Sequence, residues 1–169
     1  MKRDDVDAIL DQWRHERPDI ELSGMAVIAR ISRLERMIGP LLDTVFSKHD
    51  LESWEFDVLA TLRRSGRPFQ LTPGQLLTSM MIASATVTNR IDRLATRGLV
   101  ERVASAADKR QVLVKLTKRG FSVIDAALID HTTNEARLVS KLTPTARKRL
   151  EDGLRDLARV IADDELLRA

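Results

Sequence analysis

Residues 72–116 constrain the fold of this chain more than any other part, because two helical patterns are followed directly by two strand patterns. Thr72-Pro73 is typical of a helix start, since threonine caps an N-terminus and proline fits the first helical turn. After a turn at 82–83, a second helix is expected to begin near Ser84 and to end at Gly98. Segments rich in β-branched residues then predict a hairpin with strands at 99–103 and 111–116.

Further helical patterns precede and follow this segment. The periodicity of apolar residues predicts an accessory first helix at 4–16, a long helix after Ser23, a helix between Ser53 and Gly66, and C-terminal helices at about 118–138 and 143–162. The expected fold class is mainly α with a small β-hairpin wing. A short helix, a turn, a second helix and a hairpin is the order of a winged helix-turn-helix, and the outer helices are available for dimerisation.

The composition fits one helix-rich globular domain. The chain has 169 residues, of which 43% are hydrophobic and 31% are charged, and its pI is about 9.6. The absence of cysteine excludes disulfides, thiol chemistry and thiolate metal sites. The N-terminus lacks the apolar stretch of a signal peptide, and no window approaches the run of about 20 apolar residues that spans a bilayer. A cytoplasmic protein with no membrane partner is therefore expected.

The second helix of the motif has a polar outer face. Its apolar residues define the buried direction, and the residues most nearly opposite can all form hydrogen bonds: Thr86, Asn89, Arg93 and Thr96. Asparagine suits adenine and arginine suits guanine through paired hydrogen bonds in the major groove. Small hydroxyls near the helix starts suit phosphates. The candidate DNA-binding residues here are Thr72, Ser84, Thr86, Thr88, Asn89 and Arg93.

The tip of the predicted hairpin, residues 105–110, carries two adjacent cations. An arginine at a loop tip suits the negative potential of a narrow minor groove, and an aspartate can hold that arginine in position. The hairpin therefore resembles a wing, with Asp108, Lys109 and Arg110 as further candidate DNA-binding residues. The simpler interpretations are a solvated loop tip and, for the second helix, an ordinary surface helix.

An enzyme is the first alternative class. The three histidines His15, His49 and His131 lie far apart without partners at metal-ligand spacing, and no phosphate loop or nucleophile motif is present. We expect no catalytic residue, no metal and no cofactor. The second alternative is a non-specific architectural nucleic-acid-binding protein without an effector. The lack of tyrosine and the scarcity of other aromatic residues for base stacking argue against it.

Residues 89–120, NRIDRLATRGLVERVASAADKRQVLVKLTKRG, resemble the signature stretch of MarR-family regulators. The family's D-x-R wing motif corresponds to Asp108 and Arg110, and its L-T-x-x-G motif corresponds to Leu116, Thr117 and Gly120. The likeness extends over roughly residues 23–162. It implies an obligate dimer with intertwined N- and C-terminal helices, in which two recognition helices face the half-sites of a pseudo-palindrome about one DNA turn apart.

The extra first helix is similar to the N-terminal extension of a MarR subgroup that responds to urate or related anionic ligands. This resemblance implies an effector site made of Trp13, Asp57, Arg64 and Arg90. Arg90 lies on the flank of the recognition helix, where it is poorly aimed at DNA and can pair with Asp57. The alternative is structural, with Trp13 as a core or dimer anchor and Asp57 with Arg90 as a plain buried ion pair.

These expectations combine into one hypothesis. The chain is a ligand-responsive transcriptional regulator, expected to be a repressor, whose partners are double-stranded DNA, a second copy of itself and a small aromatic or purine-like anion. The N-terminal helices at 1–48 serve dimerisation and the effector site, residues 49–118 bind DNA as a winged helix-turn-helix, and residues 119–169 form dimerisation helices. All three are expected to form one structural unit.

Overall fold

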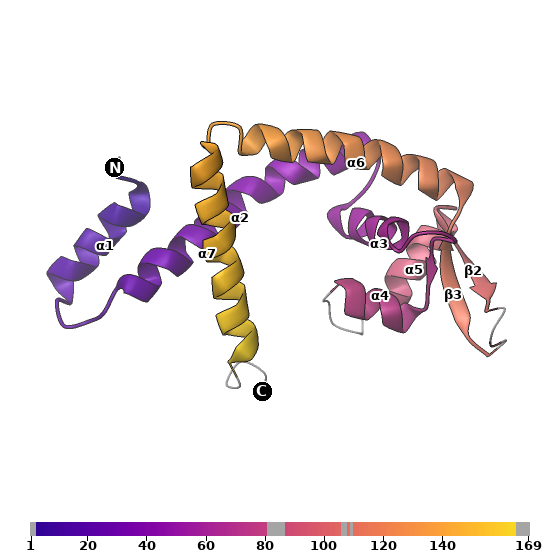
Figure 1. The fold of residues 1–169 in the computed structure, drawn as a ribbon, viewed down its shortest axis with the longest axis horizontal. Coiled ribbons are helices and arrows are strands. Elements are labelled where there is room, and N and C mark those ends of the chain that lie inside the picture. The colour runs from indigo at the N-terminus through magenta and orange to yellow at the C-terminus, as the bar shows by residue number, and fades with distance from the viewer. Residues whose placement is uncertain (1–2, 81–86, 106–107, 109, 165–169) are drawn as a thin grey trace. The chain divides into compact units, whose positions relative to one another are not determined.

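The computed structural model describes residues 3–80, 87–105, 108 and 110–164, and its ribbon is shown in Figure 1. The elements are, in order, α1 (Asp5–Glu16), α2 (Ser23–Lys48), α3 (Ser53–Arg64), β1 (Gln70–Leu71), α4 (Pro73–Met80), α5 (Val87–Thr96), β2 (Val100–Ala104), β3 (Val112–Leu116), α6 (Lys118–Leu138) and α7 (Pro144–Asp163). The fold class expected from the sequence, mainly α with a β-hairpin, is confirmed. No helix among the described residues is long and apolar enough to cross a membrane.

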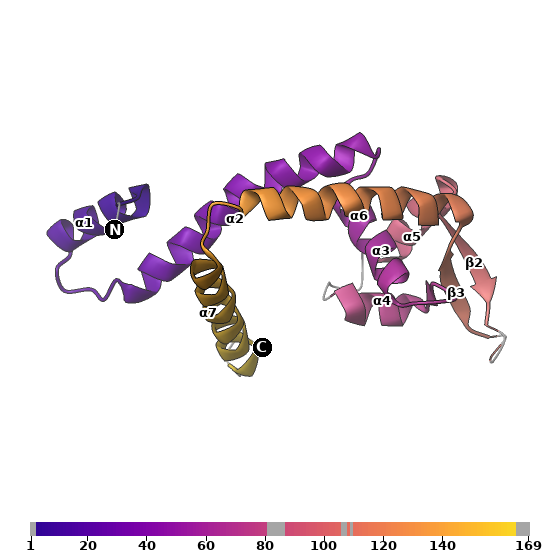
Figure 2. The same ribbon diagram turned by 45° about the horizontal axis from the view of Figure 1, so that its top comes forward.

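The sheet is small and antiparallel, with the strand order β1-β3-β2. The hairpin register pairs Val100 with Leu116 and Ala104 with Val112. The sequence interpretation missed the two-residue strand β1, in which Gln70 pairs with Lys115 and Leu71 with Val114, because such a short segment has no alternating pattern. Figures 1 and 2 show the hairpin beside the C-terminal end of α5.

The core of the helix-turn-helix is apolar and contains side chains from α3, α4, α5, β3 and α6. Ile91 and Leu94 of α5 are 1% and 0% exposed, so this helix buries the face that its periodicity predicted. The other large buried side chains of this core are Val58, Leu59, Leu62, Leu76, Leu99, Val114 and Ile124. This packing fixes the position of α5 relative to α3 and to the hairpin.

Local capping explains where the helices around the site begin and end. The hydroxyl of Thr72 accepts a hydrogen bond from the N–H of Gln75, and the Gln75 side chain accepts one from the N–H of Thr72 in return. Gly98, at φ +68°, ends the turn after α5, where the N–H of Leu99 donates to the Leu94 carbonyl at 3.0 Å. Helices α2 and α3 begin at Ser23 and Ser53, and α3 is preceded by a capping box formed by Glu52 and Glu55.

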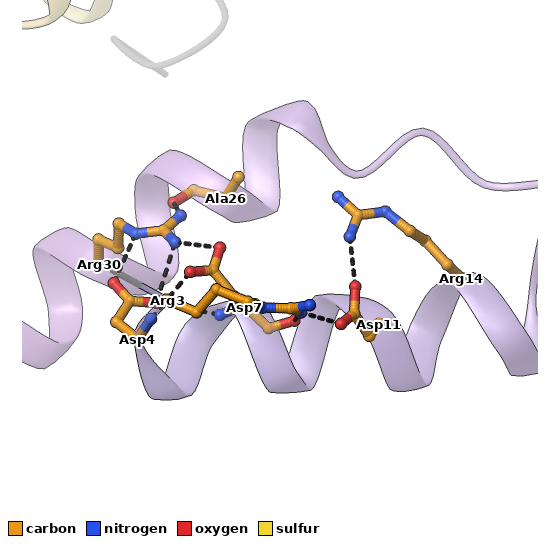
Figure 3. A network of polar contacts seen from close by, with 7 residues as sticks. All are labelled: Arg3, Asp4, Asp7, Asp11, Arg14, Ala26 and Arg30. Atoms are coloured by element: carbon orange, nitrogen blue, oxygen red, sulfur yellow. Dashed lines mark hydrogen bonds and ion pairs between the residues drawn. The ribbon is translucent and has the colours of Figure 1, made fainter. Parts of the chain in front are cut away.

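Helix α1 is attached to the N-terminal part of α2. Val6, Leu10 and Leu22 form a small buried cluster, and Arg30 of α2 bridges Asp4 at 2.9 Å and Asp7 at 2.7 Å (Figure 3). The guanidinium of Arg30 holds the pKa of Asp4 below its ordinary value. A few apolar contacts and a set of ion pairs therefore hold this helix.

The chain divides into two compact units after Ala127, inside α6. The functional divisions expected from the sequence, after residues 48 and 118 within one structural unit, stay a prediction. The boundary lies inside α6 because Gly120, Ile124 and Ala127 of this helix are buried in the first unit. Among the described residues that follow Ala127, none is buried.

Candidate nucleic-acid interface

The outer face of α5 carries the residues that were expected to contact DNA. Thr88 and Asn89 are exposed, and the side chain of Arg93 is 54% exposed. Ser84 and Thr86, which were expected from the sequence in the same helix, lie outside the described residues. Thr96 is also exposed, and its hydroxyl donates to the Asp92 carbonyl one turn earlier. Asn89 and Arg93 therefore present side-chain hydrogen-bonding groups on the exposed face of α5.

Arg93 contacts two residues at the start of α3. Its Nη2 donates to Oε1 of Glu52 at 2.6 Å, and its guanidinium lies 4.7 Å from the ring centroid of Trp54. The indole N–H of Trp54 donates in turn to Oε2 of Glu52 at 2.6 Å. The hydrogen bond from Trp54 and the one from Arg93 hold the pKa of Glu52 below its ordinary value. The carboxylate therefore stays ionised at neutral pH.

A second arginine anchors the end of α5 to α3. Arg97 pairs with Glu55, whose side chain is 1% exposed, and with Asp50 at 2.6 Å. The hydrogen bond to Glu55 raises the pKa of Arg97. A buried carboxylate needs such a partner, because an unpaired charge is costly away from water. The pair therefore fixes the orientation of α5 relative to α3.

The other flank of α5 is tied to the hairpin. Arg102 of β2 pairs with Asp92 at 2.6 Å, and Arg119 at the start of α6 donates to the Arg97 carbonyl at 3.0 Å. These contacts connect α5 to elements on both sides, so the helix and the hairpin present their outer surfaces as one body.

The hairpin tip is partly described. The Oδ1 atom of Asp108 accepts a hydrogen bond at 2.9 Å from the backbone N–H of Arg110, and both residues are exposed. The aspartate thus contacts the main chain of the arginine, whereas the sequence interpretation expected it to hold the arginine in position. Lys109 lies outside the described residues. Thr72, the remaining candidate, uses its hydroxyl in the cap of α4.

The four residues of the expected effector site do not all meet within one chain. Trp13, which is 42% exposed, lies near the end of α1, and α1 is attached to the N-terminal part of α2. α3 follows the other end of that helix, roughly 39 Å along its axis for 26 residues. Trp13 is therefore separated from Asp57 and Arg64 of α3.

The other three members of that set are arranged around α3. Arg90 lies 5.5 Å from the ring centroid of Trp54, and Asp57 is exposed one turn after that tryptophan. Arg64 is two turns further along, where its Nη2 donates to the Ser79 carbonyl at the end of α4 at 2.6 Å. The structure thus brings Arg90 to the part of α3 that carries Asp57, and the side chain of Trp54 in α3 makes the contact with Arg90.

Sequence reasoning missed Glu52 and Trp54 as parts of the site. The spacing of Glu52 and Glu55 resembles a capping box and indicates the helix start, but the contact with Arg93 spans 41 residues and leaves no local signal. The part of the chain that the structure describes contains no cluster of three or more residues able to hold a metal ion.

A polar helix face held against a hairpin by buried contacts and ion pairs defines a winged helix-turn-helix protein of the kind that binds DNA. A family model described as the MarR family matches residues 49–111. The HTH-type transcriptional regulator PecS of Dickeya dadantii is 40% identical over 146 residues, which cover 86% of this chain and 88% of PecS. The chain therefore belongs to the MarR family of transcriptional regulators, and it is not an enzyme.

Solved structures show the same fold. A mutant MarR from Escherichia coli in complex with operator DNA has a TM-score of 0.68 and 26% identity, covering 86% of this chain and 96% of that one. A structure of Bordetella bronchiseptica BpsR, whose DNA binding is regulated by 6-hydroxynicotinic acid, also has a TM-score of 0.68, with 24% identity and coverage of 78% and 92%.

Proposed function

We propose that this protein binds a pseudo-palindromic operator as a homodimer, represses transcription from it, and is released by a small aromatic or purine-like anion. The observation that carries the DNA-binding part is the exposure of Asn89 and Arg93 on a helix that Arg97 and Arg102 fix to its neighbours. Such a protein acts on the chromosome and therefore works in the cytoplasm.

The proposed division of roles follows from side-chain chemistry. Asn89 and Arg93 contact base edges, while Thr72, Ser84, Thr86 and Thr88 contact phosphates near the helix starts. At the hairpin tip, Lys109 and Arg110 enter the minor groove, and Asp108 supports the main chain of Arg110. One short helix reads few base pairs, so operator-grade affinity requires two half-sites.

The test of DNA binding is a comparison of specific and random duplexes over a salt series. We expect the protein to bind DNA upstream of its own gene at least about a thousandfold more tightly than random DNA, with an affinity that falls steeply as salt rises. Equal affinity for both duplexes at every salt concentration would contradict an operator-binding regulator and would favour an architectural protein.

The proposed effector site is built from Arg90 of α5 with Asp57 and Arg64 of α3, and Trp13 is its fourth member. An anion that binds Arg90 changes how α5 is held against α3, and this weakens DNA binding if the anion binds more tightly to the DNA-free conformation. Within one chain, Trp13 lies near the opposite end of α2 from the other three residues. Its membership of the site therefore rests on the family resemblance alone.

Release is tested by fluorescence polarisation of a labelled operator complex. Urate and 6-hydroxynicotinic acid are the probes, and we expect one of them to lower the polarisation of the wild-type complex. The Arg90→Ala variant should still bind the operator but require far more ligand for release. If neither ligand alters the complex of the wild type or of Arg90→Ala, the proposed anion site is wrong, while DNA binding itself is unaffected.

A further inference from the structure

Glu52, Trp54 and Arg93 form a closed set of contacts on the DNA-facing side of the helix-turn-helix. Each residue touches the other two: Glu52 accepts from Arg93 and from Trp54, both at 2.6 Å, and the arginine lies over the indole ring at 4.7 Å. Glu52 and Arg93 are about equally exposed, at 56% and 54% of their side chains. These groups are therefore accessible to a DNA duplex that contacts α5.

The carboxylate of Glu52 weakens the attraction between the protein and DNA. A contact that served only the stability of the fold would not explain why a negative charge is placed here. An ionised carboxylate beside the recognition helix repels phosphates and weakens non-specific binding. A surface ion pair between exposed side chains adds little to stability. The capping box of α3 explains the presence of Glu52 but not its contact with Arg93, because the box joins Glu52 to Glu55 alone.

We propose that Glu52 and Trp54 are positioning residues that hold the guanidinium of Arg93 in the orientation in which it reads a base pair. The inference rests on the proposed role of Arg93 in base recognition. An exposed arginine samples many rotamers, and ordering it on DNA costs conformational entropy. The indole face fixes the plane of the guanidinium, and Glu52 occupies only one of its five donors, so donors remain for the paired contact with guanine.

The proposal predicts a loss of sequence discrimination rather than a loss of overall affinity. Arginine bonded twice to guanine contributes about 1–3 kcal/mol of discrimination, or roughly five- to 150-fold. Without its two supports, Arg93 still attracts the duplex by its charge but is no longer held in the geometry for one base pair. The preference at that base pair therefore falls, while non-specific affinity stays constant or rises.

The experiment begins with duplexes selected by the wild-type protein from a randomised pool. Base preferences are then measured at every position for the wild type, Arg93→Ala, Glu52→Asp, Glu52→Gln and Trp54→Leu. Glu52→Asp is the sharpest variant, because it keeps both the charge and a good helix cap but is one methylene too short to reach both partners. Glu101→Gln removes the same charge from β2 without touching Arg93 and is the matched control.

We expect Arg93→Ala to remove the preference at one base pair per half-site. Glu52→Asp, Glu52→Gln and Trp54→Leu should reduce the preference at that same base pair by at least about fivefold. Glu101→Gln should leave it unchanged. Circular dichroism and thermal midpoints, measured in parallel, establish that every variant is folded.

Three results would overturn the inference. If Glu52→Asp and Trp54→Leu keep the wild-type preference at the base pair that Arg93→Ala loses, the two residues do not position Arg93, while the proposed function stands. If Glu52→Gln tightens specific and random DNA equally and keeps the preference, Glu52 acts only through its charge. If Arg93→Ala leaves every preference intact, the base-reading role of Arg93 itself is wrong, and the inference is wrong with it.

Discussion

Gly120 shows why one position of a short motif accepts only glycine. A Cβ atom at this residue would lie 1.9 Å from the backbone oxygen of Leu99 and 2.9 Å from its carbonyl carbon. The hydroxyl of Thr117 adds to the constraint, because it donates to the Gly98 carbonyl at 2.8 Å and accepts from the Gly120 N–H at 3.0 Å. The sequence Leu-Thr-x-x-Gly therefore joins the start of α6 to the turn after α5.

The substitution Gly120→Ala should destabilise the protein, because a backbone atom has to move to admit the methyl group. We expect a loss of about 1–3 kcal/mol or more in the free energy of unfolding, measured by urea denaturation. Gly24→Ala is the control, since nothing lies within 4 Å of its added Cβ. Equal stability of Gly120→Ala and the wild type would contradict the close approach of α6 to Leu99.

Residue-level prediction from the sequence succeeded where periodicity decides and failed where contacts are distant. The burial of Ile91 and Leu94 follows from helical spacing, and so does the exposure of Asn89. The contact of Arg93 with Glu52 does not, because no local pattern connects residues so far apart in the chain. The same limit explains why the position of Trp13, far along α2 from Asp57, could not be foreseen.

At the scale of elements, α1 is attached to α2 by few buried side chains, which are Val6, Leu10 and Leu22. Its polar contacts are numerous: besides Arg30 with Asp4 and Asp7, Arg33 pairs with Asp5. Ion pairs at exposed positions are weak singly and are screened by salt. The attachment of α1 to α2 is therefore expected to depend on ionic strength and on charge.

Removing Arg30 should loosen α1 and leave the DNA-binding helices unchanged. In Arg30→Gln, we expect amide hydrogens of α1 to exchange a few times faster than in the wild type, while those of α3 keep their rates. Arg14→Gln is the control, because Arg14 contacts Asp11 within α1 itself (Figure 3). If both variants exchange alike, Arg30 does not attach α1.

Acid should weaken the same attachment. The pKa of Asp4 is lowered mainly by the hydrogen bond from Arg30, and the pKa of Asp7 by the Asp4 N–H and then by Arg30. A carboxyl whose pKa is lowered on folding stabilises the fold above its unfolded pKa, and this stability is lost as the pH falls through the folded pKa. The loss should therefore begin near the ordinary value of 3.8 and continue below it.

Titration of the carboxyl carbons by NMR checks this directly. Asp4 and Asp7 should titrate below 3.8 in the wild type and shift upward in Arg30→Gln. Asp4 should shift more, because Arg30 is the largest cause of its lowered pKa. Unchanged titration of both residues in Arg30→Gln would show that Arg30 does not stabilise their ionised forms.

At the scale of the whole molecule, the long helices α2 and α7 each carry a stripe of exposed apolar side chains. On α2, Leu34 is 47% exposed, Met37 58% and Leu41 42%, and on α7 Leu150 and Leu154 are 45% and 47% exposed. The periodicity of α2 predicted such a stripe, but periodicity cannot distinguish a face that closes a monomer core from one that binds a second copy. The proposed homodimer assigns this stripe to the contact with a second copy.

Charge placed on this stripe should therefore break the dimer and, with it, operator binding. In Leu34→Asp/Ile38→Asp, each chain of the dimer would bury two carboxylates in place of two apolar side chains, each of which contributes about 1.5–3 kcal/mol when buried. We expect the dimer dissociation constant to rise by at least about a hundredfold, measured by analytical ultracentrifugation. Operator affinity should fall toward that of random DNA, because a monomer reaches one half-site only. The control is Ser32→Asp, which changes the opposite and exposed face of α2 and should remain dimeric. If Leu34→Asp/Ile38→Asp also remains dimeric, the interface lies on other helices.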